Sequence, residues 1–291
     1  MSGPFPVAYS LELVGGIKLD IALVETARLL LHEETIPEVL RCLTRRIRDD
    51  GVLMAPVIVD REALVVLDGM HRVEALRALG CRFTCACLVD YESPEIKVEQ
   101  WCRTVSRPFD AEKAAEVAGE LDLRLSPRAP RKEGELDEHH VALAFGGSCC
   151  EALTSNLGLL PAFEAVRKLE LRLREMGFEV RYETAREAEE SLRKGAAGAI
   201  IYPPKIGKKQ VVEIARKGRV FTFKATRHVI PARPVGVDVP LSLLRDPELS
   251  IEEANRALSA LLSRKGLRYV PSSGVWRGRR YEEGLYIFED A

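Results

Sequence analysis

The sequence predicts a mixed α/β protein built from two domains. Short apolar runs typical of buried strands alternate with segments in which apolar residues recur at helical spacing. The length of 291 residues, with 46% hydrophobic and 30% charged residues, suits a globular chain with two cores. The plainest unit is residues 65–76, where an apolar run leads through a turn into a helical pattern. We expect one domain over residues 1–105, a second over 106–245, and a C-terminal extension over 246–291.

The first domain is expected to contain several strands around its helices. Residues 20–26 are centred on a short apolar run and predict a strand. A helix is predicted over residues 37–50, because Pro37 suits a first helical turn and Gly51 suits the position after the last one. Val39 is expected to face the core from this helix. Further strands are expected over residues 55–59, 64–67, 83–89 and 96–102.

The second domain is expected to alternate strands and helices, which is the pattern of an α/β domain. Residues 124–140 contain two Pro and one Gly among many charges, so an exposed loop is predicted there. In the extension, Ser250 and Glu253 form the capping signature of a helix over 251–263, and a hairpin is expected in the tail. Helices are expected over residues 111–121, 162–176, 185–194 and 208–217, and strands over 141–145, 178–182, 199–202 and 220–223.

The turn at residues 67–72 concentrates reactive groups between a strand and a helix. Gly69 permits a backbone geometry or a close approach that a side chain would block. The following helix directs its free N–H groups and the positive end of its dipole at the turn, which suits a phosphate. Arg72 adds a forked donor, and His71 adds a donor or acceptor near neutral pH. The plain alternative is an ordinary strand–turn–helix in which Asp68 caps the helix and the other side chains are solvated.

A second candidate site is the triplet Thr226-Arg227-His228, which follows a predicted strand. A hydroxyl, a guanidinium and an imidazole together can hold a carboxylate or a phosphate. The alternative for the triplet alone is a charged surface turn. Residues 207–209 lack the Gly spacing and the Ser/Thr of a Walker A loop, and no protein-kinase motif set is present. Phosphoryl transfer would therefore depend on the turn at 67–72, which is adequate because this chemistry needs positioning and charge neutralisation.

Charge and composition argue against several other classes. The net charge of -1 gives no electrostatic reason to expect nucleic acid or an anionic membrane as a partner. We find no apolar run long enough to cross a bilayer and no signal-peptide pattern, so a cytoplasmic location is expected. The 7 Cys include no CxxC pair, so Cys81, Cys85 and Cys87 are predicted to pack in the core and not to bind a metal. The scarcity of Asn and Gln hints at a hot habitat.

Three segments together resemble one known family. The LDGMHR segment at residues 67–72 resembles the DG(H)HR box of the ParB/sulfiredoxin superfamily, most closely that of the archaeal free L-serine kinases. The KATRHVIP segment at residues 224–231 is similar to the KTTRHV-(L/I)-P segment of the same kinases. His32 and Glu33 resemble part of their Pro-His-Glu segment, with Leu31 in the place of the Pro.

The resemblance extends from Lys18 to Leu244. It implies a ParB/sulfiredoxin-like first domain that binds a nucleotide, a second α/β domain, and an active site in the cleft between them. It also implies that Glu33 is the general base, that Asp68 and His71 take part in catalysis, and that Asp68 is a candidate Mg²⁺ ligand. The resemblance assigns phosphate binding to Asp68, Gly69, Met70, His71 and Arg72, and substrate binding to Trp101, Thr226, Arg227 and His228.

The function implied is that of a free L-serine kinase. Such an enzyme uses Mg²⁺ and transfers a phosphoryl group from ATP or ADP to L-serine, giving O-phospho-L-serine for cysteine and serine metabolism. One alternative is a ParB-like nucleotide-binding protein associated with DNA, but the balanced charge and the missing helix-turn-helix pattern argue against it. Another is a sulfiredoxin-like reductase, which needs a Cys in the box. Here Met70 or Gly69 stands in that place, and Met70 also replaces the family's more usual first His.

Overall fold

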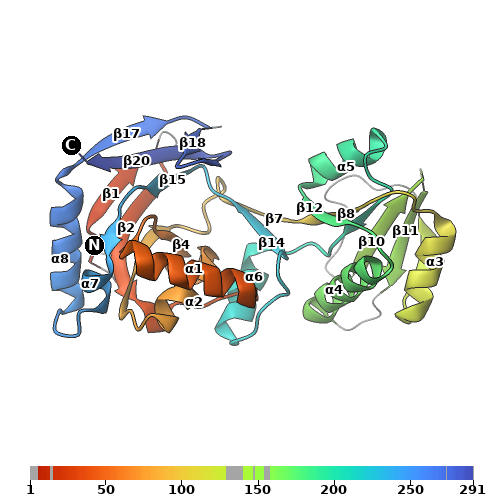
Figure 1. Ribbon diagram of the computed structural model, residues 1–291, viewed down its shortest axis with the longest axis horizontal. Coiled ribbons are helices and arrows are strands. Elements are labelled where there is room, and N and C mark those ends of the chain that lie inside the picture. Colours follow the sequence, from red (N-terminus) through yellow and green to blue (C-terminus); the bar gives the residue numbers. More distant parts are fainter. Residues whose placement is uncertain are drawn as a thin grey trace. The chain divides into compact units, whose positions relative to one another are not determined.

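The computed structural model describes residues 6–13, 16–128, 140–146, 148–153, 158–272 and 274–290. Helices and several sheets give the expected mixed α/β class (Figure 1). The chain forms two compact units, each with its own sheet and core. Unit 1 contains Met1–Lys97, Val211–Arg219 and His228–Ala291, and unit 2 contains Val98–Gln210 and Val220–Arg227.

Unit 1 is organised around a five-stranded sheet in the order β1-β2-β6-β4-β5. β4 and β6 run parallel, and the other neighbours are antiparallel. Every residue of β4 and β6 is buried, which explains why their sequences are mainly apolar. The strands are β1 (Tyr9–Glu12), β2 (Lys18–Glu25), β4 (Val57–Asp60), β5 (Val66–Asp68) and β6 (Phe83–Val89).

Several helices accompany the sheet of unit 1, and α1 and α2 pack against each other (Figure 1). The helix predicted over 37–50 is confirmed, and Gly51 ends it in a left-handed conformation. Val39 does not face the core, however, because its side chain is 46% exposed. A helical period predicts a buried stripe without saying how wide it is. The helices are α1 (Pro37–Asp50), α2 (Met70–Ala78), α7 (Leu241–Arg245) and α8 (Ile251–Leu262).

The helix α8 is joined to β2 by one of the few Asn side chains of the chain. The capping box predicted at Ser250 and Glu253 is present at its start. Asn255 is buried, accepts a hydrogen bond from Leu23 N at 2.8 Å and donates one to Leu23 O at 3.0 Å. The amide therefore satisfies backbone groups of β2 beyond the last residue paired with β1, as buried polar backbone requires.

The predicted C-terminal hairpin is confirmed as two antiparallel strands, β17 (Lys265–Val270) and β20 (Gly284–Asp290). β20 also pairs in parallel with β15 (Ala232–Val235). The tail is therefore part of unit 1. Its last strand adds to the sheet beside β15, which directly follows the 224–231 segment. Two short strands, β18 (Val275–Trp276) and β19 (Arg279–Arg280), form a small ribbon between them.

Unit 2 contains a six-stranded antiparallel sheet in the order β12-β8-β13-β10-β11-β9. The loop predicted over 124–140 is wrong for residues 124–128, which form the edge strand β9, and for residue 140, which begins β10. The rest of that prediction, over 129–139, lies outside the described residues. Pro127 is tolerated in β9 because an edge strand leaves one row of backbone groups unpaired. The strands are β8 (Cys102–Val105), β9 (Arg124–Arg128), β10 (His140–Phe145), β11 (Ser148–Leu153), β12 (Val180–Glu183) and β13 (Ala199–Tyr202).

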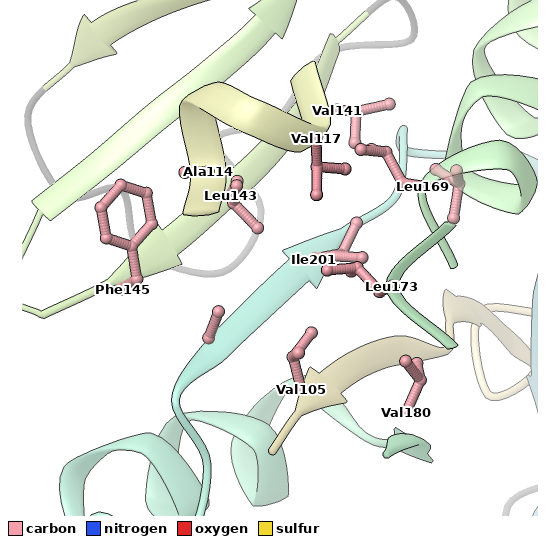
Figure 2. Packing of buried hydrophobic residues seen from close by; sticks show 12 residues of the cluster. Val105, Ala114, Val117, Val141, Leu143, Phe145, Leu169, Leu173, Val180 and Ile201 are labelled. Atoms are coloured by element: carbon pink, nitrogen blue, oxygen red, sulfur yellow. The ribbon is translucent and has the colours of Figure 1, made fainter. Parts of the chain in front are cut away.

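Helices cover both faces of the unit 2 sheet. α3 (Ala111–Glu120) and α4 (Leu159–Glu175) pack on the face that carries Ile201. Figure 2 shows the buried hydrophobic side chains between these helices and the sheet. α5 (Ala185–Arg193) packs on the face that carries Ile200. Neighbouring residues of one strand point to opposite faces, so both sides of β13 are buried.

The remaining elements include the chain passages between the units. The strand predicted over 220–223 is wrong, because the strand in this region is β14, at Thr226–Val229. Lys224 has a positive φ of 61°, so the chain turns just before β14 begins. The other elements are η1 (Thr26–Arg28), β3 (Val52–Leu53), β7 (Lys97–Gln100), α6 (Lys208–Arg216) and β16 (Val239–Pro240).

Two of the cysteines predicted to pack in the core do so completely. Cys85 and Cys87 are fully buried in β6. Burial raises the pKa of both thiols, that of Cys87 to about 12. Neutral thiols are poor metal ligands, so these two side chains act as small apolar groups. Among the described helices, none is both long and apolar enough to span a bilayer.

Candidate active site

The turn between β5 and α2 depends on a glycine. Gly69 has a φ of 102°, a conformation that residues with side chains rarely adopt. A Cβ atom at this position would lie 2.8 Å from Arg72 Nη2 and 2.8 Å from a methyl carbon of Val57. The glycine therefore permits both the turn and the close packing of the arginine over it.

Asp68 and two arginines form a charged network at the end of β5. Arg72 Nη2 and Arg233 Nη1 donate to the same carboxylate oxygen, at 2.6 and 2.8 Å. Arg233 also pairs with Glu283 through Nε. Burial alone would raise the pKa of Asp68, but the guanidinium groups of Arg233, Arg72 and Arg279 hold it well below its usual range. The carboxylate is therefore ionised at all physiological pH values.

Arg72 also fixes the turn to the preceding strand region. Its Nη1 donates to Ala55 O at 3.1 Å and to Pro56 O at 2.6 Å. With the bond to Asp68, its guanidinium makes three hydrogen bonds within the protein. The side chain therefore holds the loop in place and contributes positive charge to it.

The start of α2 can accept an anion. Gly69 is the N-cap residue and no side chain caps the helix. The predicted alternative in which Asp68 caps α2 is therefore wrong, because its carboxylate is held by the two arginines. The N–H groups of a first helical turn have no partner within the helix and carry the positive end of its dipole. The turn thus offers backbone donors beside a cationic network, which suits phosphate oxygens.

The segment that carries Glu33 is held beside this turn from both ends. Leu30 N donates to Leu64 O and Val66 N donates to Leu30 O, both at 2.9 Å, so residue 30 is bound to the start of β5. At the other end, Ile36 N donates to His71 Nε2 at 2.9 Å. A ring nitrogen that accepts carries no proton, so neutral His71 has its proton on Nδ1. His71 therefore positions the Glu33 segment against the glycine turn.

Glu33 itself is buried, with only 6% of its surface exposed. Its neighbour His32 is completely buried and meets His228 edge-to-face, with ring centres 5.2 Å apart. His228 Nε2 lies 2.7 Å from the Tyr91 hydroxyl. The structure thus brings one residue of the 226–228 triplet next to the Glu33 segment.

The burial of His32 is expected to make the folded protein less stable in acid. Burial lowers the pKa of His32 from 6.5 to about 4, against a smaller opposite effect of a hydrogen bond with the Val66 backbone. Between these values the unfolded chain binds a proton that the folded protein excludes, so stability falls as the pH drops from about 6.5 to about 4. We expect His32 to contribute a loss of roughly 3 kcal/mol over this range.

Urea unfolding at pH 7, 5.5 and 4.5 measures this loss. Carboxylates also titrate in this range, so the comparison is between the wild type and His32→Gln. The variant should lose less stability over the interval. Identical pH dependence of the two proteins would show that His32 does not titrate as its burial requires.

In unit 2, Trp101 lies within a basic cluster. The Lys224 ammonium is 4.3 Å from the centre of its ring, and the Arg227 guanidinium is 5.7 Å from it. Arg227 Nη1 donates to Glu99 Oε2 at 2.5 Å. Thr226, the first residue of the triplet, is buried. Two cations therefore lie against one aromatic ring, and one of them is paired with a carboxylate.

Arg103 holds this cluster together and is almost completely buried. It donates to Trp101 O at 2.7 Å, to Lys224 O at 3.2 Å and to Phe223 O at 3.3 Å, and it pairs with Glu170 at 3.3 Å. A single side chain therefore joins the strand after Trp101 to the segment before Thr226.

The predicted site residues thus fall into two groups, one in each unit. Glu33, the 68–72 turn and His228 belong to unit 1, and Trp101, Thr226 and Arg227 belong to unit 2. Sequence reasoning missed Arg233, Tyr91 and Arg103, which contact predicted site residues. None of them lies in a recognisable motif, and only their long-range contacts identify them. The missed residues that contact the site also include Glu99 and Glu283.

The donor set for a metal is small. Within the described ranges, no group of three or more His, Cys, Asp or Glu side chains could hold a metal ion. Asp68 offers one ionised carboxylate whose side chain is 35% exposed. Mg²⁺ in nucleotide sites is held by one or two carboxylates together with phosphate oxygens. The chemistry of this residue therefore fits a Mg²⁺ ion held mainly by a nucleotide.

The chain is similar to L-serine kinases over most of their length, although no protein-family model matches it. It is 27% identical over 238 residues to the ATP-dependent L-serine kinase of Desulfurococcus mucosus, covering 78% of this chain and 92% of that protein. It is 25% identical over 236 residues to the ADP-dependent L-serine kinase of Thermococcus kodakarensis, covering 78% and 94%. A solved free serine kinase in complex with AMP aligns with a TM-score of 0.64 and 24% identity, over 78% of this chain and 94% of that chain. The resemblance predicted from the three segments is confirmed.

Proposed function

We propose that the protein is a free L-serine kinase that transfers a phosphoryl group from ATP or ADP to the hydroxyl of L-serine. The products are O-phospho-L-serine and ADP or AMP. The observation that carries the proposal is the similarity to kinases named for this activity over at least 92% of their length. It is supported by a glycine turn with phosphate-binding character and a buried glutamate segment within one unit.

The phosphates of the nucleotide bind at the start of α2. The N–H groups of Gly69, Met70 and His71 donate to phosphate oxygens, and the charge of Arg72 adds to the helix dipole. Met70 contributes only its backbone, so the replacement of the family's first His leaves this part of the site intact. Asp68 would hold Mg²⁺ at this site, and the bound ion would supply positive charge to offset that of the phosphates.

Glu33 is the general base. It takes the proton from the serine hydroxyl as the oxygen attacks the terminal phosphorus, and the bond from that phosphorus to the nucleotide oxygen breaks. The electron pair of the broken bond leaves with the ADP or AMP product. His71 keeps Glu33 in register with the phosphates through its bond to Ile36 N.

Serine is held by the basic groups of the triplet. The guanidinium of Arg227 and the imidazole of His228 bind the substrate carboxylate or the transferring phosphoryl group, and Thr226 donates from its hydroxyl. Trp101 covers the substrate with its ring, and its stacking with Lys224 and Arg227 supports this role. Tyr91 orients the ring of His228 through their 2.7 Å contact.

The activity is tested by product formation with each donor. The purified protein, L-serine and Mg²⁺ are incubated with ATP or with ADP, and phosphoserine is measured by mass spectrometry beside the nucleotide product. We expect phosphoserine with ADP as co-product from ATP, or with AMP as co-product from ADP. Reactions without serine control for nucleotide hydrolysis. Formation of no phosphoserine from either donor would refute the proposal.

A ParB-like protein that binds DNA remains the competing function for the same box. Its prediction is a salt-sensitive gel shift with duplex DNA, because phosphate contacts dominate such binding. The net charge of -1 favours the kinase instead. A shift at moderate salt together with no phosphoserine would favour the competing function.

A further inference from the structure

A third arginine of unit 1, in the C-terminal tail, acts on the Asp68 network through its charge. Arg279, in β19, has its guanidinium carbon 4.8 Å from the centre of the Tyr281 ring. The guanidinium carbon of Arg233 lies 5.8 Å from the same ring, and Tyr281 is buried. Arg233 in turn donates to Asp68 at 2.8 Å and pairs with Glu283. The guanidinium groups of a tail arginine and of the arginine that contacts Asp68 thus both lie within 6 Å of the centre of one aromatic ring.

The tail is fixed in this position by its backbone. β20 pairs with β15 in a register that sets Leu285 opposite Arg233. Gly284 N donates to Pro231 O at 3.0 Å. A Cβ atom on Gly284 would lie 2.7 Å from the Tyr269 hydroxyl, so this strand packs closely against β17. Tyr281 and Glu283 lie in the short connection between β19 and β20, directly before this paired strand.

The network carries an excess of positive charge. It contains the guanidinium groups of Arg72, Arg233 and Arg279 and the carboxylates of Asp68 and Glu283. Arg279 is exposed, and its charge acts on both Asp68 and Arg72. Planar guanidinium groups match phosphate oxygens with paired N–H donors. An exposed cation on the ring that Arg233 also approaches is thus suited to an anion bound near Asp68.

We propose that Arg279 of the C-terminal tail binds a phosphate group of the donor nucleotide, and that the tail completes the phosphate site of unit 1. The identity of the phosphate compound rests on the proposed function, whereas the anion site itself does not. Arg233, paired with Asp68 and Glu283, forms the floor of this site, and the ring of Tyr281 supports the guanidinium of Arg279. The tail lies beyond the segments that carry the family resemblance, which end at Leu244.

The test compares two neighbouring arginines. Arg279 and Arg280 are successive exposed residues of β19, so their side chains leave the strand on opposite faces. Binding of ADP, inorganic pyrophosphate and adenosine to the full chain is measured by calorimetry for the wild type, Arg279→Ala and Arg280→Ala. We expect Arg279→Ala to weaken ADP and pyrophosphate binding about 10-fold, as loss of one exposed charged hydrogen bond implies. Arg280→Ala should stay within about twofold of the wild type, because surface charges far from a ligand contribute little.

The kinase assay separates the two proposals. If serine kinase activity is present, Arg279→Ala should raise KM for the nucleotide about 10-fold with little change in kcat. If Arg279→Ala weakens pyrophosphate binding and Arg280→Ala does not, the anion site is supported even in a protein that makes no phosphoserine. Equal binding and equal KM for the two variants would overturn the site even in an active kinase. Adenosine has no phosphate, so a loss of its binding in Arg279→Ala would also contradict the proposal.

Discussion

Replacing Glu33 with Gln is expected to lower the rate of phosphoserine formation by about 10²–10⁴-fold, the usual contribution of a positioned general base. The amide keeps the size of the side chain but cannot take the proton from the serine hydroxyl. Because Glu33 is buried and its segment is fixed by Leu30 and His71, the variant should fold with the same geometry. Single-turnover assays with each donor measure the rate, and ADP affinity by calorimetry should change less than about threefold.

The matched control is Glu34→Gln. Glu34 is the next residue, it carries the same chemical group, and it is more exposed than Glu33. Its replacement should leave the rate within a few-fold of the wild type. If Glu33→Gln keeps normal turnover, or if Glu34→Gln loses as much, then Glu33 is not the base. Failure of both variants to bind ADP would instead indicate damage to the fold.

Replacing Arg103 with Met is expected to lower the free energy of unfolding of unit 2 by about 3–5 kcal/mol, the cost of removing one partner of a buried ion pair. Arg103 is 1% exposed, and its removal leaves Glu170 without that cation and three backbone carbonyls without their donor. Leaving buried acceptors unpaired is itself destabilising. The loss should also loosen the segment that holds Lys224 and Thr226.

The two tryptophans make this measurement specific. Trp101 lies in unit 2 and Trp276 in unit 1, so Trp276→Phe leaves a fluorescent reporter of unit 2 alone. In this background, urea unfolding of Arg103→Met is compared with that of Arg181→Met. The second replacement removes an exposed arginine of β12 from its exposed partner Glu179. That control should change the unfolding free energy by less than about 1 kcal/mol. Equal effects of the two replacements would show that the buried network does not stabilise unit 2.

Local chemistry made the helices and the glycine turn predictable. α1 begins at Pro37 and ends before Gly51, as predicted, and the capping box at Ser250 and Glu253 starts α8. Gly69 adopts the positive φ that the turn between β5 and α2 requires. These features depend on residues within a few positions of each other, so their signals lie in short stretches of sequence.

The edge strand and the segment around residue 224 show where such signals fail. Residues 124–128 contain a Pro and charges, yet they form β9 because β11 supplies hydrogen-bond partners. Residues 220–223 were expected as a strand, but the strand begins at Thr226, after a turn. Strand formation depends on the neighbouring strand, which the local composition does not reveal.

The candidate site divides in the same way. Sequence patterns alone predict the helix that offers N–H groups to an anion and, through the family resemblance, the candidate residues Glu33, Asp68 and Arg227. The contact of Asp68 with Arg233, which is 165 residues away, and the pairing of a tail strand beside that arginine become visible only in the folded chain. Charge pairs and sheet neighbours of this kind form between segments that are distant in sequence. Such contacts leave no periodic pattern or spacing that a single sequence could show.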